Sequence, residues 1–406
     1  MGANPPCNSC LVDLILWATI ITVGLALIFD FSNGFHDAAN ATATVIATKS
    51  LKPKTAVAIS AVFNFLPAFV IGTAVANTIS KTVNIDALPT VAEGMIPIGL
   101  RVTLAALLGA IFWNFFTWAL GLPSSSSHAL IGGLIGAGIS AGGTQAVSWS
   151  TVSKTAIAII ASPLIAFLVA IIASWLIKAS QKIFKLDDDH EVFRWGQIIS
   201  SAFLSWGHGS NDAQKTMGII AATLYASGYL VAEDASKLTP TTWVIFSAQT
   251  AIAMGTFYGG WRIIQTMGLN ITHITRASGM AANIGAITSI SGATHLGIPI
   301  STTHAAASSV IGSGVGTGHK VHLNTVGRMM SAWVVTLPSA GIVGFITFKA
   351  TVLPGIWAFV VTGFLIVALL AYAIRLMFSA TTAADVERAL PLAVAASVSI
   401  EDKPAA

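Results

Sequence analysis

The amino-acid sequence predicts an all-α polytopic membrane protein. Of its 406 residues, 54% belong to the hydrophobic set and only 9% are charged, against about 25% charged residues in an average soluble protein. The apolar runs are long and unbroken, whereas the strands of a membrane β-barrel alternate apolar and polar residues. These observations exclude a soluble globular protein, a disordered chain, a coiled coil and a transmembrane barrel.

Apolar segments that approach or exceed the ~20 residues needed to cross a bilayer recur along the whole chain. In chain order they are 11–31, 55–80, 95–120, 151–177, 241–268, 277–296, 325–347 and 355–378. Shorter stretches rich in Gly, Ser, Thr and Pro lie at 34–48, 123–140, 211–230 and 297–316. We expect broken helices, re-entrant hairpins or short spans in these stretches, and roughly ten to twelve crossings in total.

Two sequence motifs occur twice at nearly the same spacing. The stretch GFHDA begins at Gly34, and GSNDA begins 175 positions later at Gly209. The stretch GLPSSSSHA begins at Gly121, and GIPISTTHA begins 176 positions later at Gly297. Because two independent pairs share this spacing, the sequence predicts a duplication of a unit of about 175 residues.

The charges around the first motif pair predict that the two repeats are inverted. No Lys or Arg precedes segment 11–31, whereas Lys49, Lys52 and Lys54 follow the first motif. In the second half the basic residues precede the motif and acidic residues follow it: Lys178, Lys182, Lys185 and Arg194 come before, Glu233 and Asp234 after. Since Lys/Arg-rich loops stay cytoplasmic, equivalent loops face opposite sides and the amino terminus lies outside. Inverted repeats are typical of secondary transporters, whose substrate site lies near the middle of the membrane.

These features divide the chain into consecutive parts. The predicted parts are an extracytoplasmic segment (1–10), a first transmembrane repeat (11–177), a cytoplasmic linker (178–195), a second transmembrane repeat (196–350), an additional C-terminal transmembrane helix (351–378) and a polar tail (379–406). Cys7 and Cys10 form a C-x-x-C pair in the first part. Two thiols are too few for a closed zinc site, so we assign them no metal function.

Asp37 and Asp212 occupy equivalent positions in the two repeats, each in a polar interruption of a long apolar region. A carboxylate at membrane depth costs at least ~2.5 kcal/mol on insertion scales, so it is expected to have a functional partner. Further polar side chains surround the pair: Asn33, His36, Asn40, His208, Asn211, Gln214 and Lys215. Carboxylate, amide and backbone oxygens are the ligands that a hard cation prefers, and Lys215 is expected to balance Asp212. The alternative is a buried hydrogen-bond network that joins two broken helices.

A cluster of hydroxyl side chains follows a proline in each repeat, at Ser124–Ser127 and at Ser301–Thr303. This pattern is typical of a helix N-terminus, where free N–H groups and the helix dipole bind anions. Two such termini from inverted repeats are predicted to surround one anion, and ordinary N-caps are the alternative. A histidine follows each cluster, His128 in the first repeat and His304 in the second. For this pair a proton-linked role competes with a packing role.

The four motifs together resemble those of the inorganic phosphate transporter family, and most closely its bacterial branch of low-affinity phosphate permeases. They are GFHDAANATATVIAT (34–48), WNFFTWALGLPSSSSHA (113–129), SWGHGSNDAQKTMG (205–218) and GIPISTTHA (297–305). The resemblance extends over about residues 11–378. Many members have Asn-Asp in both motifs, whereas this chain has His36-Asp37 in the first, which leaves the coupling ion open.

The resemblance implies that the duplicated Asn-Asp motif and the two hydroxyl clusters form the cation and phosphate sites. The implied ligands of the coupling cation are Asp37, Asn40, Asn211 and Asp212. The implied phosphate ligands are Ser124, Ser125, Ser126, Ser127, Ser301, Thr302, Thr303 and Gln214. The proton-linked candidates are His36, His128 and His304, because histidine titrates near physiological pH.

The sequence therefore predicts a secondary active transporter, not an enzyme, that imports inorganic phosphate across the cell membrane by symport with Na⁺ or H⁺. No cofactor or metal is expected beyond the coupling cation. The expected partners are phosphate, free or as a metal–phosphate complex, and membrane lipid; no nucleic acid is expected, and a homodimer is left open. A permease for sulfate or another oxyanion is one alternative. A channel and an intramembrane Ser–His hydrolase are the alternatives of other classes.

Overall fold

The computed structural model describes residues 8–70, 72–92, 95–233, 238–379 and 381–389, and of residues 8–12 only the backbone. Within these ranges the regular elements are helices, apart from two isolated β-bridges. This confirms the predicted all-α class. Cys7, the Cys10 side chain and most of the predicted polar tail lie outside the described residues.

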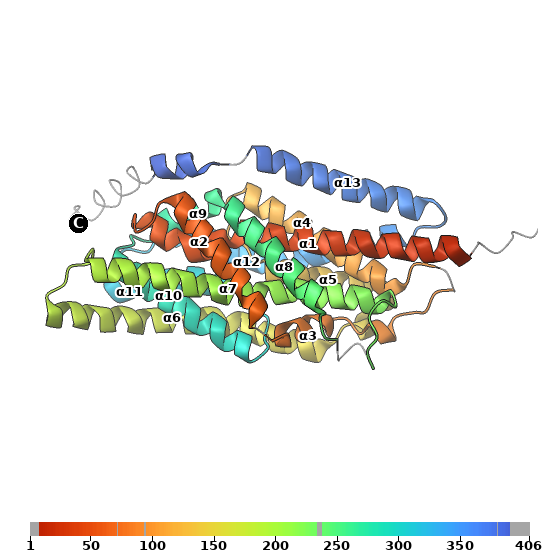
Figure 1. Ribbon diagram of the computed structural model, residues 1–406, viewed down its shortest axis with the longest axis horizontal. Coiled ribbons are helices and arrows are strands. Elements are labelled where there is room, and N and C mark those ends of the chain that lie inside the picture. The colour runs from red at the N-terminus through yellow and green to blue at the C-terminus, as the bar shows by residue number, and fades with distance from the viewer. Residues whose placement is uncertain (1–7, 71, 93–94, 234–237, 380, 390–406) are drawn as a thin grey trace, which may run out of the picture.

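The helices fall into two sets in chain order (Figure 1). The first set is α1 (Asn8–Ala47), α2 (Pro53–Phe65), η1 (Leu66–Phe69), α3 (Ala74–Ser80), η2 (Ile85–Ala87), α4 (Ile98–Ala119), α5 (Ser126–Gly142), η3 (Thr144–Ala146) and α6 (Trp149–Phe184). The second set is α7 (Glu191–Ala226), α8 (Thr242–Tyr258), α9 (Trp261–Leu269), α10 (Arg276–His295), α11 (Thr302–Thr317) and α12 (Leu323–Thr351). Helix α13 (Trp357–Phe378) follows, and residues 383–389 are also helical.

The packing of the two sets is reciprocal. Helix α5 of the first set packs on α12 of the second, and α11 of the second packs on α6 of the first. In the same way α1 packs on α8 and α7 packs on α2. Figure 1 shows α1 running from right to left and α7 from left to right. The predicted inverted duplication is therefore confirmed, with a connection between the repeats that spans only residues 185–190.

The helix breaks lie elsewhere than the sequence predicts. Helices α1 and α7 continue through the aspartate motifs without interruption, so the breaks expected within 34–48 and 211–230 are wrong. The glycines of these motifs serve close packing instead. A side chain at Gly34 would meet the backbone of α8, and one at Gly209 would meet the backbone of α2. The breaks separate α2 from α3, and α8 from α9 at Gly259, where φ is +81°.

Each hydroxyl cluster lies at the tip of a helical hairpin. Helices α4 and α5 pack against each other and are joined by residues 120–125, and α10 and α11 are joined in the same way by residues 296–301. Ser124, Ser125 and Ser301 in these tips are buried. A hairpin whose tip lies inside the helix bundle matches the predicted re-entrant hairpins.

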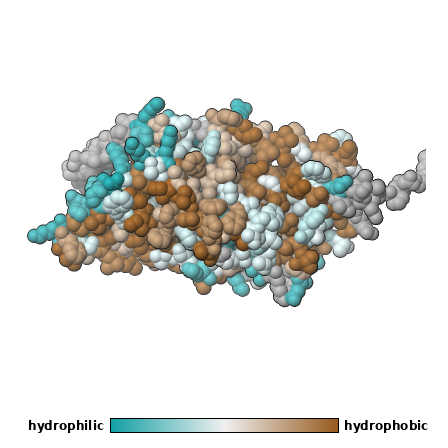
Figure 2. All heavy atoms as spheres, in the orientation of Figure 1, coloured by the Kyte–Doolittle hydropathy of each residue, from teal (hydrophilic) through white to brown (hydrophobic). Residues whose placement is uncertain are grey.

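The outer surface is apolar and the interior carries many polar side chains. In the part of the chain that the structure describes, five helices could cross a membrane by length and composition (α1, α4, α6, α12 and α13), or six if the bent pair of α2 with η1 and α3 forms one span. Their outward side chains include Trp175, Val334 and Phe364, each at least 60% exposed. Figure 2 shows this apolar surface over most of the face in view, with hydrophilic residues gathered mainly toward the two ends. These features indicate a multi-pass membrane protein.

The interface between α5 and α12 allows no side chain at its closest point. A Cβ atom at Gly136 would overlap the backbone of Gly341, so we expect Gly136→Ala to lower the stability by about 1–3 kcal/mol through overpacking. The measurement is the midpoint of thermal unfolding in detergent. Gly24→Ala in α1 is the matched control, because nothing lies within 4 Å of its added Cβ. Equal midpoints for the two variants would contradict this close contact.

Candidate functional site

The two hairpin tips meet the aspartate motifs of α1 and α7 in the interior of the bundle. Asp37 and Asp212 are both buried, and Asn33 connects them. The Ser126 hydroxyl donates to Asn33 Oδ1 (2.7 Å) and to Asp37 Oδ2 (3.3 Å), and Asn33 Nδ2 donates to Asp212 Oδ2 (3.4 Å). Ligand atoms of Asp37, His208 and Asp212 lie within 4.8 Å of one another. This group has the donor set and the spacing of a cation site.

Lys215 ties α7 to both hairpin tips. Its ammonium donates to Asp212 Oδ1 (2.5 Å), to the Ser127 hydroxyl (2.5 Å) and to the Ile300 carbonyl (2.8 Å). The side chain is fully buried, and its three donors have three acceptors. The predicted pairing of Lys215 with Asp212 is confirmed.

Each motif holds the hairpin of its own repeat, and the contacts correspond. Ser126 donates to Asp37, and its counterpart Thr302 donates to Asp212 at 3.0 Å. One position earlier, His36 Nε2 lies 3.4 Å from both the Thr117 and Ser124 hydroxyls. Its counterpart Asn211 donates to the Thr294 hydroxyl (2.9 Å) and the Ile298 carbonyl (3.4 Å). The pseudo-symmetry of the sequence therefore extends to single hydrogen bonds.

Three positions after each aspartate, a side chain reaches the hairpin of the other repeat. Asn40 in the first repeat donates to the hydroxyls of Thr302 (3.4 Å) and Thr303 (3.3 Å) in the second. Lys215 in the second repeat donates to Ser127 in the first. The two tips are also joined directly, because Ser127 donates to the Ile300 carbonyl at 2.8 Å. The N-termini of α5 and α11 thus converge on one point.

The residue directly before each of the helices α5 and α11 is an N-cap whose hydroxyl accepts a backbone hydrogen bond. Ser125 accepts from the His128 backbone N–H and Ser301 from the His304 backbone N–H, both at 3.2 Å. These two hydroxyls are used locally, as the N-cap alternative expects. The hydroxyls of the following residues point to the aspartate motifs and to the opposite tip; they belong to Ser126, Ser127, Thr302 and Thr303.

His128 and His304 lie face to face behind the tips. Their rings stack with centroids 4.6 Å apart, and His304 stacks on Trp333 at 4.0 Å. His128 Nδ1 and His304 Nε2 have no hydrogen-bond partner among the described residues. This geometry shows packing of the pair, and their proton-linked role stays a prediction.

Gln214 does not join the hydroxyl clusters in this structure. Its Oε1 accepts from the Val75 backbone N–H (2.9 Å), and its Nε2 donates to the Ser210 carbonyl (2.7 Å). The amide therefore fastens α3 to α7. Its assignment as a phosphate ligand stays a prediction.

Asp30 is a further carboxylate at this centre, to which the sequence motifs assign no role. It is completely buried, and neither of its oxygens has a hydrogen-bond partner among the described residues. It lies beside Thr216 and interacts electrostatically with Asp212 and Lys215. Its spacing of three and seven residues from Asn33 and Asp37 places all three on one face of α1, and this periodicity was the signal available in the sequence.

Comparisons with known proteins show the family of this chain. The model of the phosphate transporter family matches residues 33–188 and 178–344. A probable low-affinity inorganic phosphate transporter of Mycobacterium tuberculosis (strain CDC 1551 / Oshkosh) is 44% identical over 90% of this chain and 85% of its own length. The protein described in the same words from Bacillus subtilis (strain 168) is 43% identical over 83% of this chain and 98% of its own.

One solved structure has a similar fold. It is described as the sodium-dependent phosphate transporter, and it superposes with a TM-score of 0.69. The match covers 82% of this chain and 98% of that chain at 22% sequence identity, so the likeness concerns the fold.

The ion pair of Lys215 with Asp212 generates a stability prediction. Lys215→Met leaves a buried carboxylate without its cation, and we expect a loss of about 3–5 kcal/mol. The double variant Lys215→Met with Asp212→Asn removes both charges and should recover most of that loss. Thermal unfolding in detergent measures both. A double variant as unstable as Lys215→Met would show that Lys215 acts mainly through Ser127 and Ile300.

Proposed function

Because the chain belongs to the phosphate transporter family, we propose that it imports inorganic phosphate across the cell membrane by symport with cations that bind at Asp37 and Asp212. The observation that carries this proposal is the charge balance of the buried centre. Three carboxylates, those of Asp30, Asp37 and Asp212, share the centre with one ammonium group, that of Lys215, and with two imidazoles. His36 Nδ1 lies 2.6 Å from Asp37 Oδ1, and His208 Nε2 lies 3.3 Å from Asp212 Oδ2. An anion has to bind beside this acidic set.

Electrostatics makes co-transported cations necessary. With its carboxylates ionised, the centre is net negative, and a phosphate dianion adds to that charge in a region from which water is excluded. Burying unbalanced charge is prohibitive. Cations at Asp37 and Asp212 offset it and attract the anion, so that each ligand raises the affinity for the other. Sodium ions, protons or a metal carried with the phosphate would each supply this charge.

The hairpin tips provide donors suited to a tetrahedral anion. The N-termini of α5 and α11 converge with the hydroxyls of Ser126, Ser127, Thr302 and Thr303. In the proposed complex, phosphate oxygens accept the hydrogen bonds that the Ile300 carbonyl and the Ser127 hydroxyl accept in this structure. The Lys215 ammonium lies between the tips, where it can exchange Ser127 for a phosphate oxygen while it keeps Asp212.

The bonds between the repeats suggest how access alternates. Asn40 to Thr302 and Thr303, and Lys215 to Ser127, close the centre across the repeat boundary. Breaking one set while the other holds would open the site to one side at a time. The glycine-lined contacts of α5 with α12 and of α11 with α6 permit such sliding, since small residues let helix backbones approach closely.

The distribution of basic residues supports an extracellular amino terminus. Lys49 follows the end of α1, which lies beside the start of α7, where Arg194 Nε donates to the Ser50 carbonyl at 3.3 Å. Lys178, Lys182 and Lys185 precede this junction. Because the Lys/Arg-rich end faces the cytoplasm, the opposite end, where α1 begins, faces outward.

Uptake of labelled phosphate into proteoliposomes, with Na⁺ and pH gradients imposed separately, tests the coupling. Uptake is expected to follow one of the two gradients and to exceed equilibrium. Asp37→Asn and Asp212→Asn are each expected to lower the rate at least about 100-fold, because each removes a charge that attracts the cation. The exposed Asp13→Asn is the matched control and should transport like the wild type. Rates indifferent to both gradients would refute symport.

Selectivity for phosphate over sulfate follows from the carboxylates of the centre. At neutral pH phosphate keeps a P–OH group that can donate a hydrogen bond to a carboxylate. Sulfate has no such group and would leave the carboxylate oxygen without a hydrogen bond. A 100-fold excess of sulfate is therefore expected to inhibit phosphate uptake by less than about half. Equal inhibition by sulfate and unlabelled phosphate would favour a general oxyanion permease.

The hydrolase alternative has no support in the geometry. Residues 138–142 (GISAG) match the G-x-S-x-G pattern, but a nucleophile elbow needs a strand-to-helix turn. Here the stretch lies in continuous helix α5, and Ser140 donates to the Phe345 carbonyl at 3.1 Å. The relatives and the structural neighbour are described as transporters.

A further inference from the structure

We propose that a polar pocket at the Lys/Arg-rich end of the molecule is a second binding site for a tetrahedral oxyanion, occupied by free phosphate between the central site and the cytoplasm. This inference rests on the proposed function. It concerns a pocket whose polar side chains lie outside the aspartate and hydroxyl motifs, although Gly121 and Leu122 at the start of the first hydroxyl motif also line it. We call it the vestibule.

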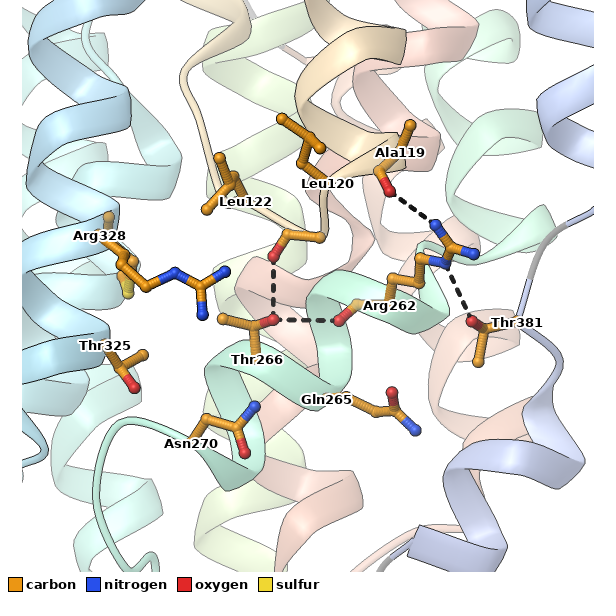
Figure 3. Close-up of a pocket in the computed structure, with 12 residues that line it drawn as sticks. Ala119, Leu120, Leu122, Arg262, Gln265, Thr266, Asn270, Thr325, Arg328 and Thr381 are labelled. Carbon is orange, nitrogen blue, oxygen red and sulfur yellow. Dashed lines mark hydrogen bonds between the residues drawn. The ribbon is translucent and has the colours of Figure 1, made fainter.

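The vestibule lies among the end of α4, helix α9 and the first turns of α12 (Figure 3). Its volume is about 400 Å³, enough for a hydrated phosphate ion. Its polar lining consists of Arg262, Gln265, Thr266, Asn270, Thr325 and Arg328, together with Thr381 after α13. Among the described residues, both charged residues of this lining are arginines and no acidic residue takes part in it. The field in the pocket therefore favours an anion.

The two arginines differ in how they are held. Arg262 Nη1 donates to the Ala119 carbonyl (2.6 Å) and its Nε donates to the Thr381 hydroxyl (3.2 Å). Arg328 donates to none of the described residues, and Figure 3 shows its guanidinium extended from α12 toward Thr266. A fixed arginine beside one with free donors suits the binding and release of an oxyanion, because guanidinium groups bind such anions through paired N–H bonds.

The vestibule shares its wall with the central site. Gly121 and Leu122 line the pocket, and Pro123 and Ser124 follow directly in the buried hairpin tip. The Thr266 hydroxyl donates to the Gly121 carbonyl at 3.0 Å. One turn beyond Met329, which also lines the pocket, Trp333 donates to the Pro123 carbonyl (2.9 Å) and stacks on His304. A movement of the tip that opens the central site on this side would open it into the vestibule.

The chemistry of the vestibule differs from that of the centre in one respect. Its described lining contains no carboxylate. The amides of Gln265 and Asn270 and the threonine hydroxyls can each present a donor or an acceptor, so the pocket recognises the charge and shape of an oxyanion without requiring a P–OH group. Sulfate should therefore bind in the vestibule about as well as phosphate. The phosphate group of an anionic lipid has the same chemistry, and the experiment must separate that source from free phosphate.

Protection of an introduced cysteine tests occupancy directly. In the full chain with Cys7→Ser and Cys10→Ser, Thr325→Cys places a thiol in the vestibule, and its rate of maleimide labelling is measured in phosphatidylcholine vesicles. Phosphate and sulfate at equal concentration are expected to slow labelling to a similar extent, and chloride is not. Protection by neither oxyanion would overturn the proposal. So would protection that appears only with phosphatidylglycerol in the vesicles, because the occupant would then be a lipid headgroup.

Phosphate exchange in inside-out and right-side-out vesicles tests the role in transport. Arg328→Gln is expected to raise the KM for phosphate about three- to tenfold at the cytoplasmic face, and to leave the KM at the outer face unchanged. Arg375→Gln, an exposed arginine on α13 outside the pocket, is the matched control and should change neither. Equal shifts at both faces, or no shift, would overturn the vestibule.

The two measurements separate this inference from the function on which it rests. Protection of Thr325→Cys by phosphate without transport by the wild type would leave the vestibule standing and refute the transporter. Transport by the wild type, with no protection of Thr325→Cys by phosphate, would support the transporter and refute the vestibule.

Discussion

Burying a lysine ammonium and an aspartate carboxylate in the interior of a membrane protein costs less free energy when the two are paired than when each is alone. In this molecule they enter together, as Asp212 and Lys215 on one turn of α7, and their remaining hydrogen-bonding capacity organises the centre. The ammonium reaches the tips of both hairpins, and the carboxylate accepts from Thr302 and approaches His208. The convergence of two re-entrant tips on one point therefore depends on this pair. A ligand that binds at the centre therefore has to replace some of the hydrogen bonds of this pair.

The same pair shows where the two repeats have diverged. Most contacts of the first repeat have counterparts in the second, down to Ser126 with Asp37 and Thr302 with Asp212. Lys215, however, corresponds to neutral Asn40, and Asp30 corresponds to Ser205, which donates to Ser60 at 2.9 Å. The second repeat thus has a cation, Lys215, that the first repeat lacks, and the first repeat has an anion, Asp30, that the second lacks. The two charges interact between α1 and α7. An inverted duplication of neutral units would be symmetric toward both sides of the membrane. This charge pair breaks the symmetry between the two repeats.

The sequence was sufficient to predict the class, the inverted duplication and the residues that meet at the centre, because apolar runs and repeated motifs report these features directly. It was misleading about helix breaks. A glycine next to polar residues suggests a break in the helix. Gly34 and Gly209 instead allow the backbone of a neighbouring helix to approach closely, which only the packing shows. The sequence also could not predict the direction of individual side chains. Gln214, for example, points to α3, where its Oε1 accepts a hydrogen bond from the Val75 backbone N–H. The vestibule could not be foreseen, because Arg262 and Arg328 lie far apart in the sequence in segments without a shared motif.

The contrast between hydroxyls at the centre and arginines at the periphery follows from what a transporter must do. A binding site on a transport path has to be favourable enough to be entered and weak enough to be left. An arginine in the dry centre would hold a phosphate dianion too tightly. In the proposed symport mechanism, hydroxyls and helix N-termini bind phosphate through partial charges, Asp212 balances the Lys215 ammonium, and the co-transported cations supply the compensating charge. In the vestibule water screens the arginines, so the same guanidinium group attracts phosphate without trapping it. In this view the scarcity of charge in this chain is a condition of turnover, and the two arginines of the proposed vestibule lie where water screens their fixed charge.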